Sequence, residues 1–225
     1  MDERLYGDHR ADIVKVARAL IERHITSKSL HGNISVRVPG TDHLVMTGSS
    51  LAGLSEDDLA VIDLDDNVLD GHVAPTEFEV IAMHTAVYRV RAGLTCVVHT
   101  HSPAASAYAV ASRPLPVFAE SLARWGITTD TPVAAWAPRG SEASVSNIVD
   151  ALEREPGAAA VLLENHGVLV GGADATEALR RSIALEENAE LGILAERLGG
   201  ARAMTRDQAE AAVARKKRFL ESGPA

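Results

Sequence analysis

The sequence predicts a single α/β domain that spans residues 1–225. A chain of 225 residues suits one such domain, and an apolar content of 46% is ample for a hydrophobic core. Segments with the apolar and β-prone pattern of strands are interleaved with segments in which apolar residues recur at helical spacing. We see no repeat, linker or low-complexity stretch in the sequence, so one domain is the simplest interpretation.

The composition argues against two classes of partner. The chain has 22 Lys and Arg against 31 Asp and Glu, a net charge of −9, and lacks the basic block typical of nucleic-acid binding. It also lacks a run of 18 apolar residues and an apolar signal core after Met1. We therefore expect a cytoplasmic protein without nucleic-acid or membrane partners. Cys96 is the only cysteine, and its apolar strand setting favours a small core residue.

The first third of the chain predicts a helix and then strands. Residues 11–24 form an amphipathic helical pattern, and segments 29–38 and 43–46 read as a hairpin joined by a Pro-Gly turn. Residues 59–64 are predicted as a further strand. The hydroxyl-rich turn at 47–50 is able to gather N–H groups around an anion, or to serve as an ordinary loop.

The next helix is predicted to start at Pro75. Thr76 is a suitable N-cap, and Glu79, three residues later, completes a capping box. Glu79 therefore has a structural explanation, against which any catalytic role must be weighed.

The second half of the chain continues the alternation of helices and strands. A helix is predicted at 104–111, a strand at 133–136 and a helix around 145–152. Two later helices begin at capping signatures, the first with Asp174 and Glu177 and the second with Thr205 and Gln208. The first of these two helices is predicted to pack through Leu179, Ile183, Leu191, Leu194 and Leu198.

Three histidines form the candidate metal site. His99 and His101 end an apolar strand and, being two residues apart, share one face of it. His166 lies in a polar break between two apolar strand segments, which places it at a hairpin tip. Three neutral imidazoles on a rigid sheet are the usual protein ligands of a catalytic zinc ion, whose fourth position stays open.

Five motifs occur together in the order and approximate spacing of one known family. The sequence resembles the class II aldolase/adducin family from about Ala11 to Gly200. The motifs are His31-Gly32-Asn33-Ile34-Ser35-Val36-Arg37, Thr47-Gly48, Pro75-Thr76, His99-Thr100-His101-Ser102 and Asn165-His166-Gly167.

The resemblance implies a fold, a cofactor and a reaction. It implies a three-layer αβα domain around a mostly antiparallel sheet, and a homotetramer with active sites between subunits. Zn²⁺, or another divalent transition metal, would be held by His99, His101 and His166. The reaction implied is cleavage of a small phosphorylated ketose to dihydroxyacetone phosphate and an aldehyde. The substrate phosphate would be bound by Gly32, Asn33, Thr47, Gly48 and Thr76.

Two departures from the family pattern concern the acid/base group. The family's Pro-Ser-Ser-Glu motif is followed by a histidine four residues after the glutamate, whereas here two extra residues separate the motif from His84. The carboxylate is therefore expected to be Glu79 or Glu77, or to be absent. Glu120 stands where the fuculose-phosphate aldolases of the family carry a tyrosine, and it is the third candidate catalytic residue.

These departures leave three functions open. The leading expectation is a metal-dependent aldehyde-lyase. A methylthioribulose-phosphate dehydratase or a ribulose-phosphate 4-epimerase is the alternative within the family, because an acid at position 120 resembles those enzymes. A non-catalytic, adducin-like interaction module is the third, although such modules lack the complete histidine triad present here.

Overall fold

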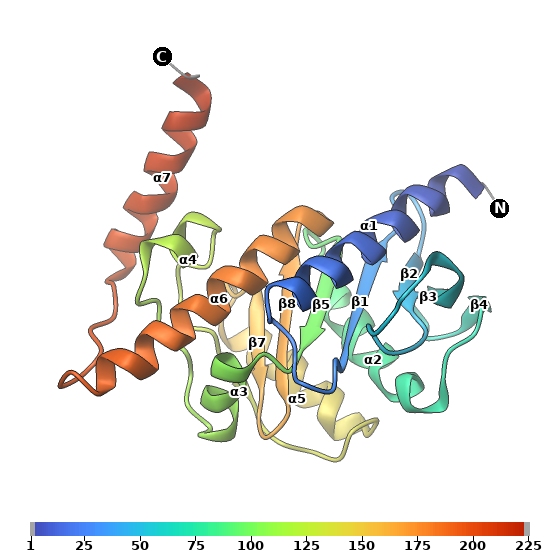
Figure 1. Cartoon of the computed structure of the whole chain (residues 1–225), viewed down its shortest axis with the longest axis horizontal. Helices are drawn as coiled ribbons and strands as arrows, with labels where there is room; N and C mark the ends of the chain where they lie inside the picture. The colour runs from blue at the N-terminus through green and yellow to red at the C-terminus, as the bar shows by residue number, and fades with distance from the viewer. Residues whose placement is uncertain (1–2, 223–225) are drawn as a thin grey trace.

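The computed structural model describes residues 3–222 and contains one central sheet (Figure 1). Its strands are β1 (Gly32–Arg37), β2 (His43–Thr47), β3 (Leu59–Asp63), β4 (Val68–Asp70), β5 (Cys96–Thr100), β6 (Val133–Ala134), β7 (Ala160–Leu163) and β8 (Gly167–Gly172). They lie in the order β4-β3-β2-β1-β5-β8-β7-β6, and every neighbouring pair is antiparallel except β6 with β7. The expected mostly antiparallel sheet is confirmed.

Helices cover both faces of this sheet, which gives three layers. They are α1 (Glu3–Glu22), α2 (Pro75–Val90), α3 (Pro103–Val110), α4 (Glu120–Arg124), α5 (Glu142–Arg154), α6 (Ala175–Glu196) and α7 (Arg206–Ser222), with a short 3₁₀ turn, η1, at Glu56–Asp58. Helices α2 and α5 pack on one face, while α1, α3 and α6 pack on the other. Helix α4 contacts α6 and α7, and α7 projects away from the sheet (Figure 1). The αβα fold is confirmed.

The alternation of strand side chains decides which face carries the candidate site. Val98 of β5 belongs to the core under α1 and α6, whereas Val97 belongs to the core under α2 and α5. Since side chains two residues apart share a face, His99 lies on the side of α2 and α5. Asn33 pairs with His99 across β1 and β5, and therefore lies beside it.

Helix α2 starts differently from the prediction. Ala74, not Thr76, is the N-cap, Pro75 is the first helical residue and there is no side-chain cap. Proline suits this position because the first helical N–H has no partner to lose. Glu79 is therefore not part of a capping box, and its carboxylate accepts a hydrogen bond from Arg139 instead.

The predicted packing face of α6 is wrong in its second half. Leu191, Leu194 and Leu198 are 50%, 53% and 90% exposed. The inner face carries Glu186 and Asn188 instead, both buried.

These two polar residues satisfy the N-terminal amides of other helices. Glu186 accepts hydrogen bonds from the N–H groups of Ala104 and Ala105 at the start of α3, at 2.7 and 2.8 Å. Asn188 accepts from Phe118 and Ala119, just before α4, at 2.8 and 3.0 Å. Free amides at a buried helix start are costly, which explains why two polar side chains occupy the inner face of α6.

Two predicted helix caps are confirmed, and one predicted strand is shorter than expected. Asp174 caps α6 and Thr205 caps α7 as expected. The strand predicted at 133–136 is only two residues long, because the Trp136 N–H donates to the Glu164 carboxylate at 2.7 Å. None of the helices within residues 3–222 is both long and apolar enough to cross a lipid bilayer.

Candidate active site

The sheet brings the three predicted histidines together. His99 is near the end of β5 and His101 follows it, while His166 lies in the turn between β7 and β8. Because β5 pairs with β8, with Thr100 opposite Val168, this turn lies beside the end of β5. The predicted hairpin with His166 at its tip is confirmed.

Gly167 permits this close approach. A Cβ atom at this position would lie 2.5 Å from the Thr100 carbonyl oxygen and 2.9 Å from the His101 ring. Any side chain here would therefore push the hairpin away from β5.

The imidazole geometry fits a tetrahedral metal ion. One nitrogen from each ring lies within 4.8 Å of the other two, and the Nε2 atoms of His99 and His101 are 3.1 Å apart. Zinc–nitrogen distances of about 2.0–2.1 Å place two tetrahedral ligands about 3.3 Å apart. Among the described residues, this cluster contains no carboxylate. The chain thus offers three imidazole nitrogens that could hold a metal ion.

The electrostatics keep the imidazoles in their ligating form. Burial lowers the pKa of His99 well below its ordinary value, and the nearby His166 and His101 lower it further. Burial is also the main cause that lowers the pKa of His101 to about 4 and the pKa of His166 below its usual range. Neutral imidazole binds metal, so no proton must be displaced at pH 7.

A second contact orients His99. Its Nδ1 lies 3.1 Å from the carbonyl oxygen of Val168, to which only a protonated nitrogen is able to donate. This contact leaves the lone pair on Nε2, the atom that faces His101. Backbone carbonyls commonly orient metal-binding histidines in this way.

A cavity of about 340 Å³ opens beside two of the three imidazoles. Its lining combines polar and apolar side chains, and His101, His166, Arg139 and Trp136 are among them. A small sugar has room to bind here within reach of a metal on the histidines.

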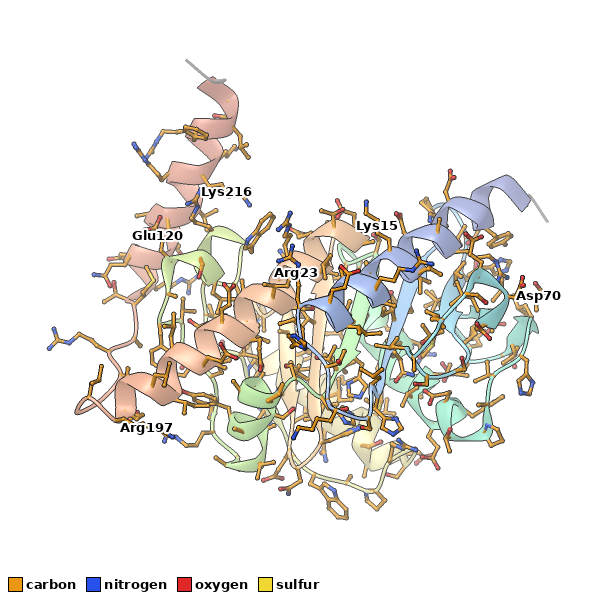
Figure 2. All side chains as sticks on the ribbon, in the orientation of Figure 1. Lys15, Arg23, Asp70, Glu120, Arg197 and Lys216 are labelled. Carbon is orange, nitrogen blue, oxygen red and sulfur yellow. The ribbon has the colours of Figure 1, made fainter. Side chains whose placement is uncertain are left out.

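The candidate carboxylates lie in three different settings. Glu77 accepts a hydrogen bond from the Asn33 side chain. Glu79 is paired with Arg139, whose Nε is 2.7 Å from its carboxylate. Glu120 is exposed at the start of α4, beside α7 (Figure 2). Since α4 packs on α6 and α7, one chain by itself does not bring Glu120 to the imidazoles.

Most of the predicted phosphate-binding residues already have partners in the chain. Thr47 is fully buried and its hydroxyl accepts a hydrogen bond from the Ile34 N–H at 3.2 Å. The Gly48 N–H donates to the Asp58 carbonyl at 2.9 Å. Gly32 lies so close to β5 that a Cβ would be 2.6 Å from the His99 carbonyl oxygen. Thr76 is exposed in the first turn of α2.

Sequence reasoning missed Arg139. It lies in the loop between β6 and α5, follows Pro138 and precedes Gly140, and lines the cavity. Its charge lowers the pKa of both His101 and His166. The available signal was a cation in a Pro-Arg-Gly turn directly after a predicted strand, a common position for binding residues.

Comparison with known proteins places the chain among aldolases. The profile described as "Class II Aldolase and Adducin N-terminal domain" matches residues 11–193. The L-fuculose phosphate aldolase of Methanococcus maripaludis strain C7 is 28% identical over 183 residues, which cover 81% of this chain and 95% of that protein.

A second relative and a solved structure extend the comparison. The 5-methylthioribulose-1-phosphate/5-deoxyribulose-1-phosphate aldolase of Rhodospirillum rubrum is 30% identical over 166 residues, covering 73% of this chain and 71% of its own. A solved L-fuculose 1-phosphate aldolase superposes with a TM-score of 0.83 at 28% identity, covering 94% of this chain and 97% of that one. These similarities confirm the expectation of a metal-dependent aldehyde-lyase. The chain therefore belongs to the class II aldolase/adducin family.

Proposed function

We propose that the chain is a zinc-dependent aldolase that cleaves a small phosphorylated ketose resembling L-fuculose 1-phosphate. The products would be dihydroxyacetone phosphate and an aldehyde. The observation that carries the proposal is the convergence of three neutral imidazoles beside a cavity, because this ligand set leaves a position for substrate. The sugar-phosphate aldolases among the relatives support the same reaction.

The reaction requires two proton transfers that protein carboxylates are able to perform. Zinc, or another divalent transition metal, would supply the positive charge that polarises the substrate carbonyl. As the C3–C4 bond breaks, the C4 hydroxyl loses a proton, the bonding electrons move toward the C2 carbonyl, and C3 then gains a proton. We assign the transfer from the C4 hydroxyl to Glu120 and the transfer to C3 to Glu79 or Glu77.

Glu120 would reach the site from a neighbouring subunit. Its exposed position at the start of α4 is compatible with such a contact, which a homotetramer with active sites between subunits would provide. The tetramer and a cytoplasmic location remain predictions.

The substrate phosphate would lie near Gly32, Asn33, Thr47, Gly48 and Thr76. The N-terminal amides of α2 favour an anion at Thr76. Asn33 would exchange its contact with Glu77 for one with the phosphate.

A dehydratase or epimerase acting on a related sugar phosphate is the second candidate. Glu120 favours it, since the fuculose-phosphate aldolases of the family carry a tyrosine at that position. An adducin-like interaction module is disfavoured, because it would not need three convergent imidazoles.

One assay separates these functions. Zinc-loaded protein is incubated with L-fuculose 1-phosphate, 5-deoxyribulose 1-phosphate and L-ribulose 5-phosphate. The products are identified by mass spectrometry, by NMR spectroscopy, which distinguishes C4 epimers, and by enzymatic detection of dihydroxyacetone phosphate. We expect aldehyde and dihydroxyacetone phosphate, and none from chelator-treated protein. Loss of water or an inverted C4 centre without cleavage would replace the aldolase assignment with the second candidate.

A further inference from the structure

Arg139 is the cationic side chain of the cavity beside the imidazoles. Among the described residues that line this cavity, it is the only Arg or Lys. The single carboxylate on the lining, Glu164, already accepts a hydrogen bond from the Trp136 N–H at 2.7 Å. A ligand that enters the cavity therefore meets one guanidinium, which is paired with Glu79 outside the lining and not with Glu164.

The guanidinium is held in position from outside the cavity. Its Nε donates to Glu79 at 2.7 Å and its Nη2 donates to the Thr76 carbonyl at 3.3 Å. Gly140, at φ +78°, brings the loop so close that a Cβ there would be 3.0 Å from the Glu79 side chain. Arginine has five N–H donors in a rigid plane, so these two contacts orient the group and leave donors for a ligand.

A cation beside a metal site requires a compensating anion. Arg139 lines the same cavity as His101 and His166, so its positive charge would also repel a metal bound by those imidazoles. The Glu79 carboxylate offsets only part of this charge, because the ion pair is 42% and 46% exposed and water screens it. An anionic ligand in the cavity would interact favourably with both the metal and the guanidinium.

The hydrogen-bond donors predicted to bind the substrate phosphate are not sufficient by themselves to hold an anion. Thr47 and Gly48 are bonded within the chain, and Asn33 faces the Glu77 carboxylate, which would repel an anion. None of these residues is a cation. Of the two other predicted residues, Gly32 has no side chain to contribute, and Thr76 is adjacent to Arg139 through its carbonyl contact.

We propose that Arg139 binds the anionic group of the substrate, a phosphate monoester or a carboxylate, in the cavity beside the histidine triad. This inference deepens the proposed function and rests on it for the identity of the substrate. Arginine is suited to either anion because two of its parallel N–H groups match two oxygen atoms.

The test compares each anionic probe with its neutral counterpart that lacks the anionic group. Isothermal titration of the zinc-loaded protein measures dihydroxyacetone phosphate against dihydroxyacetone, and glycerate against glycerol. For the anion that Arg139 binds, we expect Arg139→Gln to lower the affinity for the charged probe about ten- to a hundredfold, because a charge-assisted hydrogen bond is lost. The affinity for the neutral probe should not change. Arg139→Lys keeps the charge but not the paired donors. Its affinity for the charged probe should therefore lie between those of the parent and Arg139→Gln.

Arg197→Gln is the matched control. Arg197 is exposed at the C-terminal end of α6, so this change removes the same charge outside the cavity (Figure 2). It should bind all four probes like the parent. Thermal unfolding and zinc content verify that each variant is folded, which the exposure of the Arg139–Glu79 pair favours.

The outcomes separate the two anions and the two proposals. Loss of the preference for dihydroxyacetone phosphate identifies a phosphate site, and loss of the preference for glycerate identifies a carboxylate site. If Arg139→Gln keeps both preferences of the parent, or the parent has none, the inference is wrong. If the preference depends on Arg139 but no ketose phosphate is cleaved, the anion site stands and the aldolase proposal fails.

Discussion

Two groups of histidine-containing polar residues lie on the same face of the sheet and behave in opposite ways. The open cluster is the triad of His99, His101 and His166, whose ring nitrogens converge on one another, and two of its members line a cavity. The closed cluster is formed by His84 of α2, Ser35 of β1 and Tyr88 of α2. The Ser35 hydroxyl is 2.8 Å from both His84 Nδ1 and the Tyr88 hydroxyl.

The difference shows that hydrogen-bond partners and access to a cavity decide whether a buried histidine is able to bind a metal. His84 is fully buried, and burial lowers its pKa to about 3. Its Nδ1 is bonded to a hydroxyl, and it is not a member of the convergent histidine group of the described chain. The closed cluster thus stabilises the packing of α2 on the sheet, whereas the open cluster is able to bind a metal.

The largest expected effect is loss of metal from the open cluster. His166→Ala should weaken zinc binding more than a hundredfold, since even loss of a residue that supports a ligand typically costs about 10–100-fold. Competition with a chromophoric chelator measures this. Tyr88→Phe, in the closed cluster, is the control and should bind zinc like the parent. Equal zinc affinity in His166→Ala would remove His166 from the ligand set.

The next effect concerns Glu120, which is proposed to reach the open cluster from a neighbouring subunit. Glu120→Gln should lower turnover at least about a hundredfold, the usual contribution of a general acid or base. Zinc content and oligomer size should be unchanged. Glu79→Gln is measured beside it on the same substrate. Parent-like turnover in Glu120→Gln together with an inactive Glu79→Gln would make Glu120 structural and place the chemistry at the start of α2.

A smaller effect is expected in the closed cluster. The Tyr88 hydroxyl donates to the Ser35 carbonyl at 2.9 Å, and both residues are buried. Tyr88→Phe should therefore lower the free energy of unfolding by about 1–3 kcal/mol, measured by urea denaturation. The KM for substrate should not change. A shift in KM without a loss of stability would mean that the two clusters are not separate in function.

The closed cluster also predicts a pH dependence. Above pH 6.5, His84 is neutral in the folded and the unfolded chain, and its contribution to stability is complete. As the pH falls from 6.5 toward the folded pKa of about 3, only the unfolded chain gains this proton. Each such proton lowers the free energy of unfolding by about 1.4 kcal/mol per pH unit. His84→Gln should reduce the slope between pH 6 and 4, and an unchanged slope would contradict the assignment.

The open cluster was predictable because it depends on short-range geometry. Strand alternation places His99 and His101 on one face, and the polar break between two apolar segments places His166 at a turn. The family resemblance then grouped the three histidines as one ligand set, whereas the pairing of β5 with β8 that brings them together is seen only in the structure. All three residues are therefore identifiable from the sequence.

The cation beside the cluster could not be predicted in the same way. Arg139 reaches Glu79 across 60 positions of sequence, because the loop after β6 folds back over the start of α2. The capping prediction failed for a related reason, since Pro75 sets the helix start and turns Glu79 toward that loop. Contacts between distant loops depend on packing that local patterns do not describe.

The polar inner face of α6 constrains how this protein can be redesigned. Glu186 and Asn188 secure the beginnings of α3 and α4, and those helices start two residues after His101 and at Glu120 respectively. An optimisation of α6 for apolar burial would introduce leucine at both positions, and each change would look favourable by volume alone. It would release the amides that fix the backbone next to His101 and before Glu120. A stabilising library for this chain should therefore vary the exposed leucines of α6 and leave its buried acid and amide unchanged.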